Sequence, residues 1–269
     1  MDSIKAYELT GAYLVVSGYG WAMLNAWLTR KQLWIMAGLL VACVASGLSI
    51  TLRWISSGQG PFLTLYEVLL SNLFSLGLIY TLAYWRMPSI RVSAKVVLPF
   101  LVLLGFWLLS TSFALVPLPA TFNNYWLWIH ILSGKIFLGT CLVGVGIALV
   151  LLLNKSALAS RFQHDALDQG LLDAQIWRFM VIAFVAHSCM LVAGAVWAND
   201  AWGRYWAWDS LETWVFITWL VQGILLHLKV TFALPHWLGW VMVVAVFVLA
   251  FMTFFGIPFL SLTPHRGIM

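Results

Sequence analysis

The chain has 269 residues, of which 63% are hydrophobic and 9% are charged, and its mean hydropathy is +0.95. This number of charged residues is too small to cover the surface of a soluble domain. The composition therefore excludes a soluble globular protein and predicts an integral protein of the lipid bilayer. The net charge of +5 comes from basic residues scattered over short connections, which reports membrane topology and excludes a nucleic-acid-binding surface.

Apolar runs of about 20 residues, the length that crosses a bilayer as a helix, occur eight times along the chain. We therefore expect an all-α, polytopic membrane helix bundle with about eight transmembrane helices, built as a single integral-membrane domain over residues 1–269. In chain order, the predicted spans are 7–27, 33–54, 64–85, 95–116, 125–153, 176–198, 211–230 and 236–257.

Basic residues gather in alternate connections between these spans. Nine lie in or beside one set of connections, four lie in the other set and the termini, and Lys135 lies within a span. Because Lys and Arg are in excess in cytoplasmic loops, we expect both termini and the 117–124 loop to face outward. The chain is then a multi-pass protein of the bacterial inner (cytoplasmic) membrane. The connections with the basic excess are 28–32, 86–94, 154–175 and 231–235.

An acidic residue, Glu67, lies inside the third predicted span beside Tyr66. A carboxylate at membrane depth needs a partner or a proton. It could pair with Arg53, cap a helix end or lie near a ligand, and the sequence leaves these three roles open. The outer loop VPLPATFNNYW, residues 116–126, is turn-rich and could cover a site.

Residues 197–219, WANDAWGRYWAWDSLETWVFITW, form a tryptophan-rich segment with six tryptophans, Tyr205 and Arg204. Trp and Tyr gather at membrane interfaces, which explains part of this composition. It does not explain Trp202, Trp206 and Trp208 around one arginine. Indole faces can stack on a ring of porphyrin size, and Arg204 could pair with a carboxylate at the edge of that ring.

The same segment carries a helix-start signal. Asp209 and Glu212 have the D-x-x-E spacing of a capping box, which predicts that a helix opens there. This structural role competes with a role for Asp209 beside the ligand.

Four histidines in or next to the predicted spans are candidate ligands. His130 and His265 belong near the outer surface by topology, on either side of the tryptophan-rich segment. Two neutral imidazoles over an aromatic platform suit bis-histidine ligation of haem, and two interfacial histidines without a shared ligand are the alternative. His187 and His227 lie deeper, offset by about 6–8 Å along adjacent helices. They could form a second ligand site or simply hydrogen-bond between helices.

With these residues in view, the chain resembles the CcsA/ResC/CcmC family of haem-handling proteins. The likeness rests on the WWD domain, here at about 194–219 and followed by VQGILLHLKV. PFLTLYEVLL resembles the P-x-S-N-L-Y-E-S segment of the family, and NNYWLWIHILSGKIFLG resembles its S-x-W-L-x-x-H helix. GIPFLSLTPHRG is similar to its G-L-H-S-Y tail. The resemblance covers roughly residues 55–269 and is closest to the CcsA branch.

The resemblance implies a role in cytochrome c biogenesis. The chain would bind haem b, move it across the membrane and present it at the outer face for covalent attachment to apocytochrome c, together with a CcsB/ResB-like membrane partner. No catalytic side chain is implied, and an enzymatic role, as the membrane component of a cytochrome c haem lyase or synthase, is left open.

The resemblance also implies a ligand set. His130 and His265 would hold the iron of an outer haem, and His227 that of an inner one. His187 stands where the family has an aliphatic residue, and we hypothesise that it replaces an inner ligand of the partner chain. The remaining cofactor-binding residues would be Trp197, Trp202, Arg204, Trp206, Trp208 and Asp209.

Two departures from the family pattern keep alternatives open. The family's W-D-P-K-E is W-D-S-L-E here, and the tail reads P-H-R-G. A b-type haem electron-transfer membrane subunit of a respiratory complex, a HemX-like haem-related regulator and a haem transporter without attachment chemistry would all share the same ligands.

Overall fold

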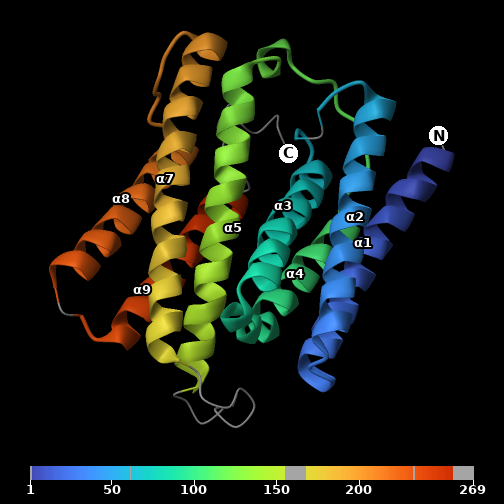
Figure 1. The fold of residues 1–269 in the computed structure, drawn as a ribbon. Coiled ribbons are helices and arrows are strands. Elements are labelled where there is room, and N and C mark those ends of the chain that lie inside the picture. The colour runs from blue at the N-terminus through green and yellow to red at the C-terminus, as the bar shows by residue number, and fades with distance from the viewer. Residues whose placement is uncertain (1, 61, 155–167, 233, 257–269) are drawn as a thin grey trace. The chain divides into compact units, whose positions relative to one another are not determined.

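A computed structural model describes residues 2–60, 62–154, 168–232 and 234–256, with side chains from residue 7 onward. The described residues form α-helices, short 3₁₀ or π turns and connections, with no β-strand among them, which confirms the predicted all-α class (Figure 1). The long helices are α1 (Asp2–Leu28), α2 (Gln32–Ser57), α3 (Leu65–Arg86), α4 (Ala94–Leu109), α5 (Tyr125–Asn154), α7 (Gln169–Trp202), α8 (Ser210–Thr231) and α9 (His236–Phe251). The short turns are η1 (Pro88–Ser93), η2 (Ala120–Phe122) and the π-helical η3 (Met252–Gly256).

Seven helical segments of the described chain are long and apolar enough to cross a membrane. They correspond to the second through eighth predicted spans. The first, α1, is 27 residues long, but tyrosines, glycines and Asn25 lower its hydropathy and it does not meet the same criterion. The helices pack into two compact units, one up to Leu118 and one from Pro119 onward. That the whole chain acts as a single integral-membrane domain stays a prediction.

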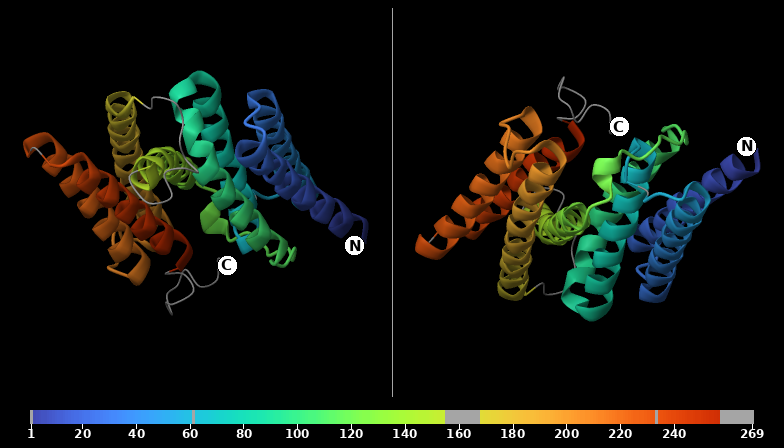
Figure 2. Two further views of the ribbon diagram at one scale, coloured as in Figure 1. Left: turned by 90° about the horizontal axis from the view of Figure 1, so that it is seen from below. Right: turned by 90° about the horizontal axis from the view of Figure 1, so that it is seen from above.

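In the first unit, α1 packs against α2 and α4, and α3 packs against the same two helices. The helices α1 and α2 lie side by side in both views of Figure 2. A Cβ atom on Gly18 would come within 2.9 Å of the Gly38 carbonyl oxygen, and one on Gly38 within 2.7 Å of the Gly18 carbonyl. Only glycine permits this approach, so small residues set the distance between these helices.

The helix α4 ends at Leu109, earlier than the predicted span of 95–116. The hydroxyl groups of Ser110 and Thr111 donate to the carbonyls of Trp107 and Leu108, both at 2.7 Å, and so compete with the helical hydrogen bonds. The chain from residue 112 to 119 is therefore irregular, although its side chains are mostly apolar.

In the second unit, α5 packs along α7 and also contacts α9, while α8 contacts α7 and α9. The helix α8 is only 17% buried over its apolar window, the smallest share among the seven spanning segments. Its inward face consists of Val215, Thr218, Gln222 and Leu225, spaced three or four residues apart as in one stripe of a helix. The other faces of α8 are not covered within this unit and can contact lipid or another chain.

Candidate functional site

The predicted ligand His130 lies on the first turns of α5, where this helix meets α7. The α5 start is fixed by Asn124, whose Oδ1 accepts from the Trp126 amide at 2.7 Å and whose Nδ2 donates to Asp200 at 2.9 Å. His130 Nδ1 lies 2.8 Å from the Met190 carbonyl oxygen. A carbonyl only accepts, so Nδ1 carries the proton and Nε2 of the neutral ring keeps the lone pair. This is the orientation in which imidazoles ligate metals.

Two further residues of α7 fix the ring of His130. Trp197 stacks on it, with ring centroids 6.4 Å apart and an interplanar angle of 28°. A Cβ atom on Gly194 would lie 2.6 Å from His130 Nδ1, so the imidazole can reach the Met190 carbonyl only beside a glycine. Trp197 is itself buried and donates from Nε1 to the Thr121 carbonyl at 3.0 Å. Trp197 thus forms the wall behind His130.

The connection between α7 and α8 holds the tryptophan-rich segment in a defined shape. The helix α7 ends at Gly203, which has φ 72° and donates its amide to the Asn199 carbonyl at 2.8 Å. Asp209 accepts from the Glu212 amide at 2.9 Å, so its predicted capping role is confirmed. Glu212, however, accepts from the Ala207 amide at 2.7 Å instead of completing a capping box. Trp208 between them is held at φ 56°, a strained conformation for a tryptophan.

This connection exposes aromatic rings. Trp208 is 68% exposed, Tyr205 60% and Trp202 41%, and Arg204 is exposed as well. Trp206 is half-buried, and its indole N–H has no hydrogen-bond partner among the described residues. The segment therefore presents ring faces, one unpartnered indole N–H and an exposed guanidinium on one strained loop.

A series of aromatic ring contacts leads from the loop through α8 to α7. Trp206 and Trp208 each make an edge contact with Phe216, which stacks on Trp219 at 5.9 Å. Trp219 stacks in turn on Phe184 at 5.5 Å. The sequence reasoning missed both phenylalanines, because a phenylalanine in an apolar helix carries no signal of its own. The spacing of three residues between Phe216 and Trp219 is the one signal that could have found the first of them.

The deeper histidines do not meet. His187 is fully buried, its Nδ1 lies 3.2 Å from Gln222 Oε1, and its ring stacks on Phe137 at 4.0 Å. His227 is exposed and contacts Thr231 at 3.4 Å. It follows Gln222 by five residues, which is about 7.5 Å along α8 and about 140° around its axis. The predicted depth offset agrees with this spacing, but the two side chains lie on different faces. His265 lies outside the described residues.

At the opposite end of α7, Asp173 accepts four hydrogen bonds. Its Oδ1 accepts from Trp240 at 2.7 Å and Trp177 at 3.2 Å, and its Oδ2 lies 3.1 Å from Lys229 and 3.3 Å from His236. The carboxylate ties α7 to α8 and α9, and it was not foreseen from the sequence. Asp173 follows its helix start closely, and only its position at the edge of an apolar run could have marked it.

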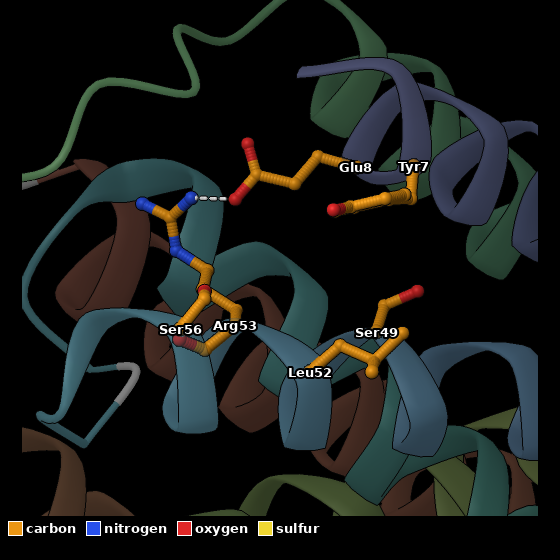
Figure 3. Close-up of a pocket in the computed structure, with 6 residues that line it drawn as sticks. All are labelled: Tyr7, Glu8, Ser49, Leu52, Arg53 and Ser56. Atoms are coloured by element: carbon orange, nitrogen blue, oxygen red, sulfur yellow. Dashed lines mark hydrogen bonds and ion pairs between the residues drawn. The ribbon is translucent and has the colours of Figure 1, made fainter. Parts of the chain in front are cut away.

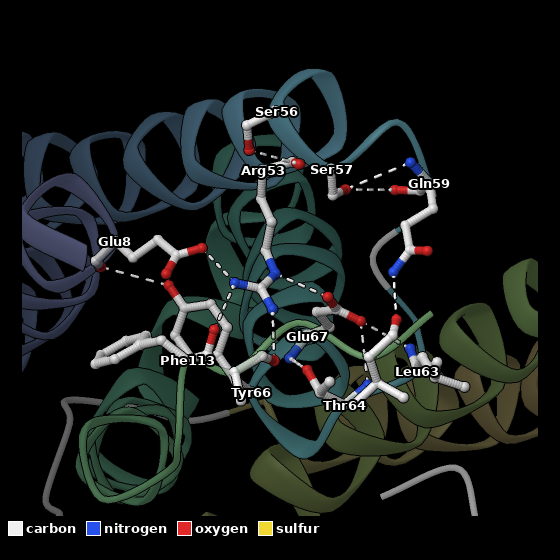
Figure 4. Close-up of polar contacts among 12 residues, drawn as sticks. Glu8, Arg53, Ser56, Ser57, Gln59, Leu63, Thr64, Tyr66, Glu67 and Phe113 are labelled. Atoms are coloured by element: carbon white, nitrogen blue, oxygen red, sulfur yellow. Dashed lines mark hydrogen bonds and ion pairs between the residues drawn. The ribbon is translucent and has the colours of Figure 1, made fainter. Parts of the chain in front are cut away.

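In the first unit, Arg53 is the centre of a buried polar cluster (Figure 4). It pairs with Glu8, donates from Nε to Glu67 at 2.8 Å, and donates to the Phe113 and Ala114 carbonyls at 3.3 and 3.2 Å. Arg53 and Glu8 also line a small hollow beside α1 (Figure 3).

Glu67 takes two of the three roles that the sequence left open. Besides pairing with Arg53, its Oε2 accepts from the amides of Leu63 and Thr64 at 2.9 and 3.1 Å and completes a capping box at the start of α3. Both oxygens are thus engaged in structure, which leaves Glu67 no need of a ligand.

The helices define a class: a polytopic helical membrane protein, here with an aromatic-rich loop beside His130. Residues 62–265 match the protein family described as Cytochrome C assembly protein. The chain therefore belongs to that family, as its motifs predicted, and its role lies in cytochrome c maturation.

Individual relatives agree with this family. The chain is 29% identical to the cytochrome c biogenesis protein CcsA of Cyanophora paradoxa over 252 residues, which cover 77% of each protein. It is 28% identical to CcsA of Atropa belladonna, with 82% of this chain and 80% of that protein covered. Among solved structures, it is similar in fold to the cytochrome c heme lyase CcmF, with a TM-score of 0.70 and 20% identity. That match covers 94% of this chain and 46% of the lyase, so this chain spans less than half the lyase's length.

Proposed function

We propose that the chain binds haem b at the outer membrane face and presents it for covalent attachment to apocytochrome c. The observation that carries this proposal is the anchoring of His130. Its Nδ1 proton is held by the Met190 carbonyl, so the lone pair of the neutral ring is on Nε2, the nitrogen through which a histidine oriented in this way binds a metal. A histidine fixed by a backbone carbonyl, beside a loop of exposed tryptophans, suits a flat iron-bearing ring.

The other residues of the loop fit the remaining parts of a haem. The exposed faces of Trp202, Trp208 and Tyr205 can cover an apolar ring. The unpartnered indole N–H of Trp206 and the exposed guanidinium of Arg204 are donors suited to propionate carboxylates. Bound haem would supply the vinyl groups that apocytochrome thiols convert to thioethers. The chain's own part is to hold the ring, orient it and exclude water from one face.

We propose His265 as the second axial ligand of this outer haem and His227 as a ligand of an inner one. The first assignment rests on the tail motif, and the second on the histidine that follows the tryptophan-rich segment. His227 lies on the exposed face of α8, where a second chain could reach it. A CcsB/ResB-like membrane partner is the proposed source of that chain, and the pair would act as a cytochrome c haem lyase or synthase.

The proposed location is the bacterial inner membrane, with the tryptophan-rich segment facing the periplasm. The basic excess in alternate connections supports that orientation. The relatives compared above come from an alga and a flowering plant. In those organisms the corresponding face would be the side of the membrane on which the cytochrome matures.

The test is an absorption spectrum of the detergent-purified chain, oxidised and reduced, with a pyridine haemochrome assay. Wild type is compared with the double variant His130→Ala/His265→Ala and with His164→Ala, a histidine from the basic 154–175 connection, as the matched control. We expect a b-type spectrum in wild type and the control, and its loss in the double variant. A wild-type chain that takes up no haem, even with excess haem and its partner present, would contradict the proposal.

A second readout separates haem delivery from electron transfer. The chain and its partner are expressed with a reporter apocytochrome, and covalent haem is measured on the reporter after denaturation. Delivery predicts covalent product that depends on His130. Bound haem that exchanges electrons with a quinone, without covalent product, would favour the b-type electron-transfer alternative.

A further inference from the structure

One end of the first unit gathers basic residues at the two turns that join α1 to α2 and α3 to α4. Both turns lie at the same end of the unit, the lower end in Figure 1. We call these residues the basic patch: Arg30, Lys31, Arg86, Arg91 and Lys95.

The first unit has no carboxylate near this patch. The sequence contains no Asp or Glu from residue 9 to 66 or from residue 68 to 164. Glu8 and Glu67 are both bound to Arg53, which lies about 33 Å further along α2 than Lys31. The positive charge of the patch is therefore not balanced by the acidic residues of its own unit.

Contacts between helices join the two turns into one surface. Arg91 donates from Nη1 to Gln32 Oε1 at the start of α2, at 2.6 Å. Lys95 Nζ, at the start of α4, lies 5.7 Å from the ring centroid of Trp27 near the end of α1. Arg30 is close enough to Lys95 for their charges to interact. The patch is thus a single surface formed by α1, α2, η1 and α4.

Membrane topology alone does not explain this arrangement. The positive-inside rule favours basic residues near one end of the helices, but it does not require them at particular positions. Arg30 is held at φ 55°, an unfavourable conformation for a residue with a side chain. Lys95 is only 5% exposed and lies near the like charge of Arg30. Two unfavourable features at one surface indicate that its positive charge has a use.

The neighbouring side chains identify what the charge could bind. Large apolar groups are exposed on the same turns and helix ends: Leu28 and Leu33 are each 77% exposed, Trp85 64% and Trp34 46%. The spans that begin or end here are apolar enough to cross a membrane, so this surface lies where the hydrocarbon core meets the headgroups. A molecule that matches both parts has an anionic head and apolar chains.

We propose that the basic patch binds the phosphodiester headgroup of an anionic phospholipid, with the acyl chains against the exposed apolar side chains beside it. Basic pockets between transmembrane helices recognise such headgroups. Arg30 and Lys31 are exposed and can reach a phosphate at the surface, while Arg91 is half-buried and fixed by Gln32. The inference does not depend on haem binding, so it and the proposed function can fail separately.

The test measures lipid binding by the purified full chain, with native mass spectrometry and with thermal unfolding in detergent micelles. The probe is phosphatidylglycerol, and the comparison is zwitterionic phosphatidylcholine with the same acyl chains. We expect phosphatidylglycerol to stay bound under conditions that remove phosphatidylcholine, and to raise the unfolding temperature more. Added salt should reduce this difference, because it screens exposed charges.

A charge-removing variant tests the residues. Arg30→Gly/Lys31→Gln removes two charges and relieves the positive φ of Arg30, so the variant should fold. A basic group near an anionic surface contributes about 1 kcal/mol, which is about fivefold in binding, so the pair should bind phosphatidylglycerol roughly 25-fold more weakly. The matched control is Arg161→Gln/Arg178→Gln, which removes two basic residues of the second unit that the same topology places on the same face.

The outcomes decide between a lipid and other anions. Selective loss of phosphatidylglycerol in Arg30→Gly/Lys31→Gln, with normal unfolding in phosphatidylcholine, supports the proposal. Equal binding of the two lipids by wild type, or equal weakening in the variant and its control, overturns it. If glycerol 3-phosphate or a hexaglutamate peptide stabilises the chain as much as phosphatidylglycerol does, the patch is a site for free phosphate or an acidic peptide, and the lipid proposal is wrong.

Discussion

Replacing Gly194 by alanine tests whether the position of His130 governs the site. The new Cβ atom would lie 2.6 Å from His130 Nδ1 and 2.9 Å from its Cε1, closer than a Cβ atom packs in proteins. An ordinary contact is 3.4 Å or more, so the ring must withdraw by about 0.8 Å, the difference between 3.4 and 2.6 Å. Trp197 stacks on the ring and limits how it can turn away.

The displacement removes the hydrogen bond that orients the imidazole. The Nδ1 to Met190 oxygen distance of 2.8 Å would lengthen toward about 3.6 Å, beyond the range of a hydrogen bond. Loss of such an orienting contact lowers metal affinity about 10- to 100-fold. Stability should change little, because alanine in a helix is favoured over glycine by about 1 kcal/mol and overpacking costs about 1–3 kcal/mol.

The assay is a haem titration of the purified variant, followed by thermal unfolding of the same sample. The matched control is Gly170→Ala in the same helix, where the nearest atom to the new Cβ lies at an ordinary 3.4 Å. We expect weak haem binding and near-normal unfolding for Gly194→Ala, with the control like wild type. Wild-type affinity and spectrum in Gly194→Ala would refute the anchoring of His130 as the basis of the site.

Three further predictions concern other parts of the chain. Arg53→Met leaves Glu8 and Glu67 buried without their cation, which should lower the free energy of unfolding in denaturant by about 3–5 kcal/mol. A loss below about 1 kcal/mol would show that this ion cluster does not stabilise the fold. Asp209→Ala removes the α8 cap and should lower the free energy of unfolding by about 0.5–2 kcal/mol in the same assay, whereas Asp209→Asn, which keeps an acceptor for the Glu212 amide, serves as the control. The left-handed backbone conformation of Trp208 costs about 1–2 kcal/mol, and Trp208→Gly relieves that strain. The variant should therefore unfold at no lower denaturant concentration than wild type, but it should bind less haem. Unchanged haem binding would show that Trp208 does not contribute to the site.

Hydropathy predicted the positions of most helices, because the thickness of the bilayer sets the length of an apolar run that can cross it. The predicted span 125–153 and the helix Tyr125–Asn154 nearly coincide, and so do 64–85 and Leu65–Arg86. The prediction was wrong where hydroxyl groups override an apolar pattern. Ser110 and Thr111 end α4 about two turns before the apolar run does.

The site was predictable in composition but not in its contacts. Topology predicted that His130 lies near the outer surface beside the tryptophan-rich segment, and in the structure its ring stacks on Trp197 of that segment. The contact of His130 with Met190 and Gly194 depends on how α5 slides along α7, which no local pattern encodes. The sequence predicts His227 as a candidate partner of His187, whereas the residue that contacts His187 from α8 is Gln222, on the inward stripe of that helix.

The cluster around Arg53 has a consequence for how the protein is made. Glu8 precedes Arg53 along the chain, and the helices that carry them are consecutive and packed together. During synthesis from the N-terminus, the guanidinium would find its first carboxylate already in the bilayer, before α3 delivers Glu67. The carbonyls of Phe113 and Ala114 arrive last and close the cluster. The hairpin of α1 and α2 can therefore enter the membrane with Arg53 already paired to Glu8. The first unit is complete when Arg53 also binds the carbonyls of the 112–119 segment, which leads to α5.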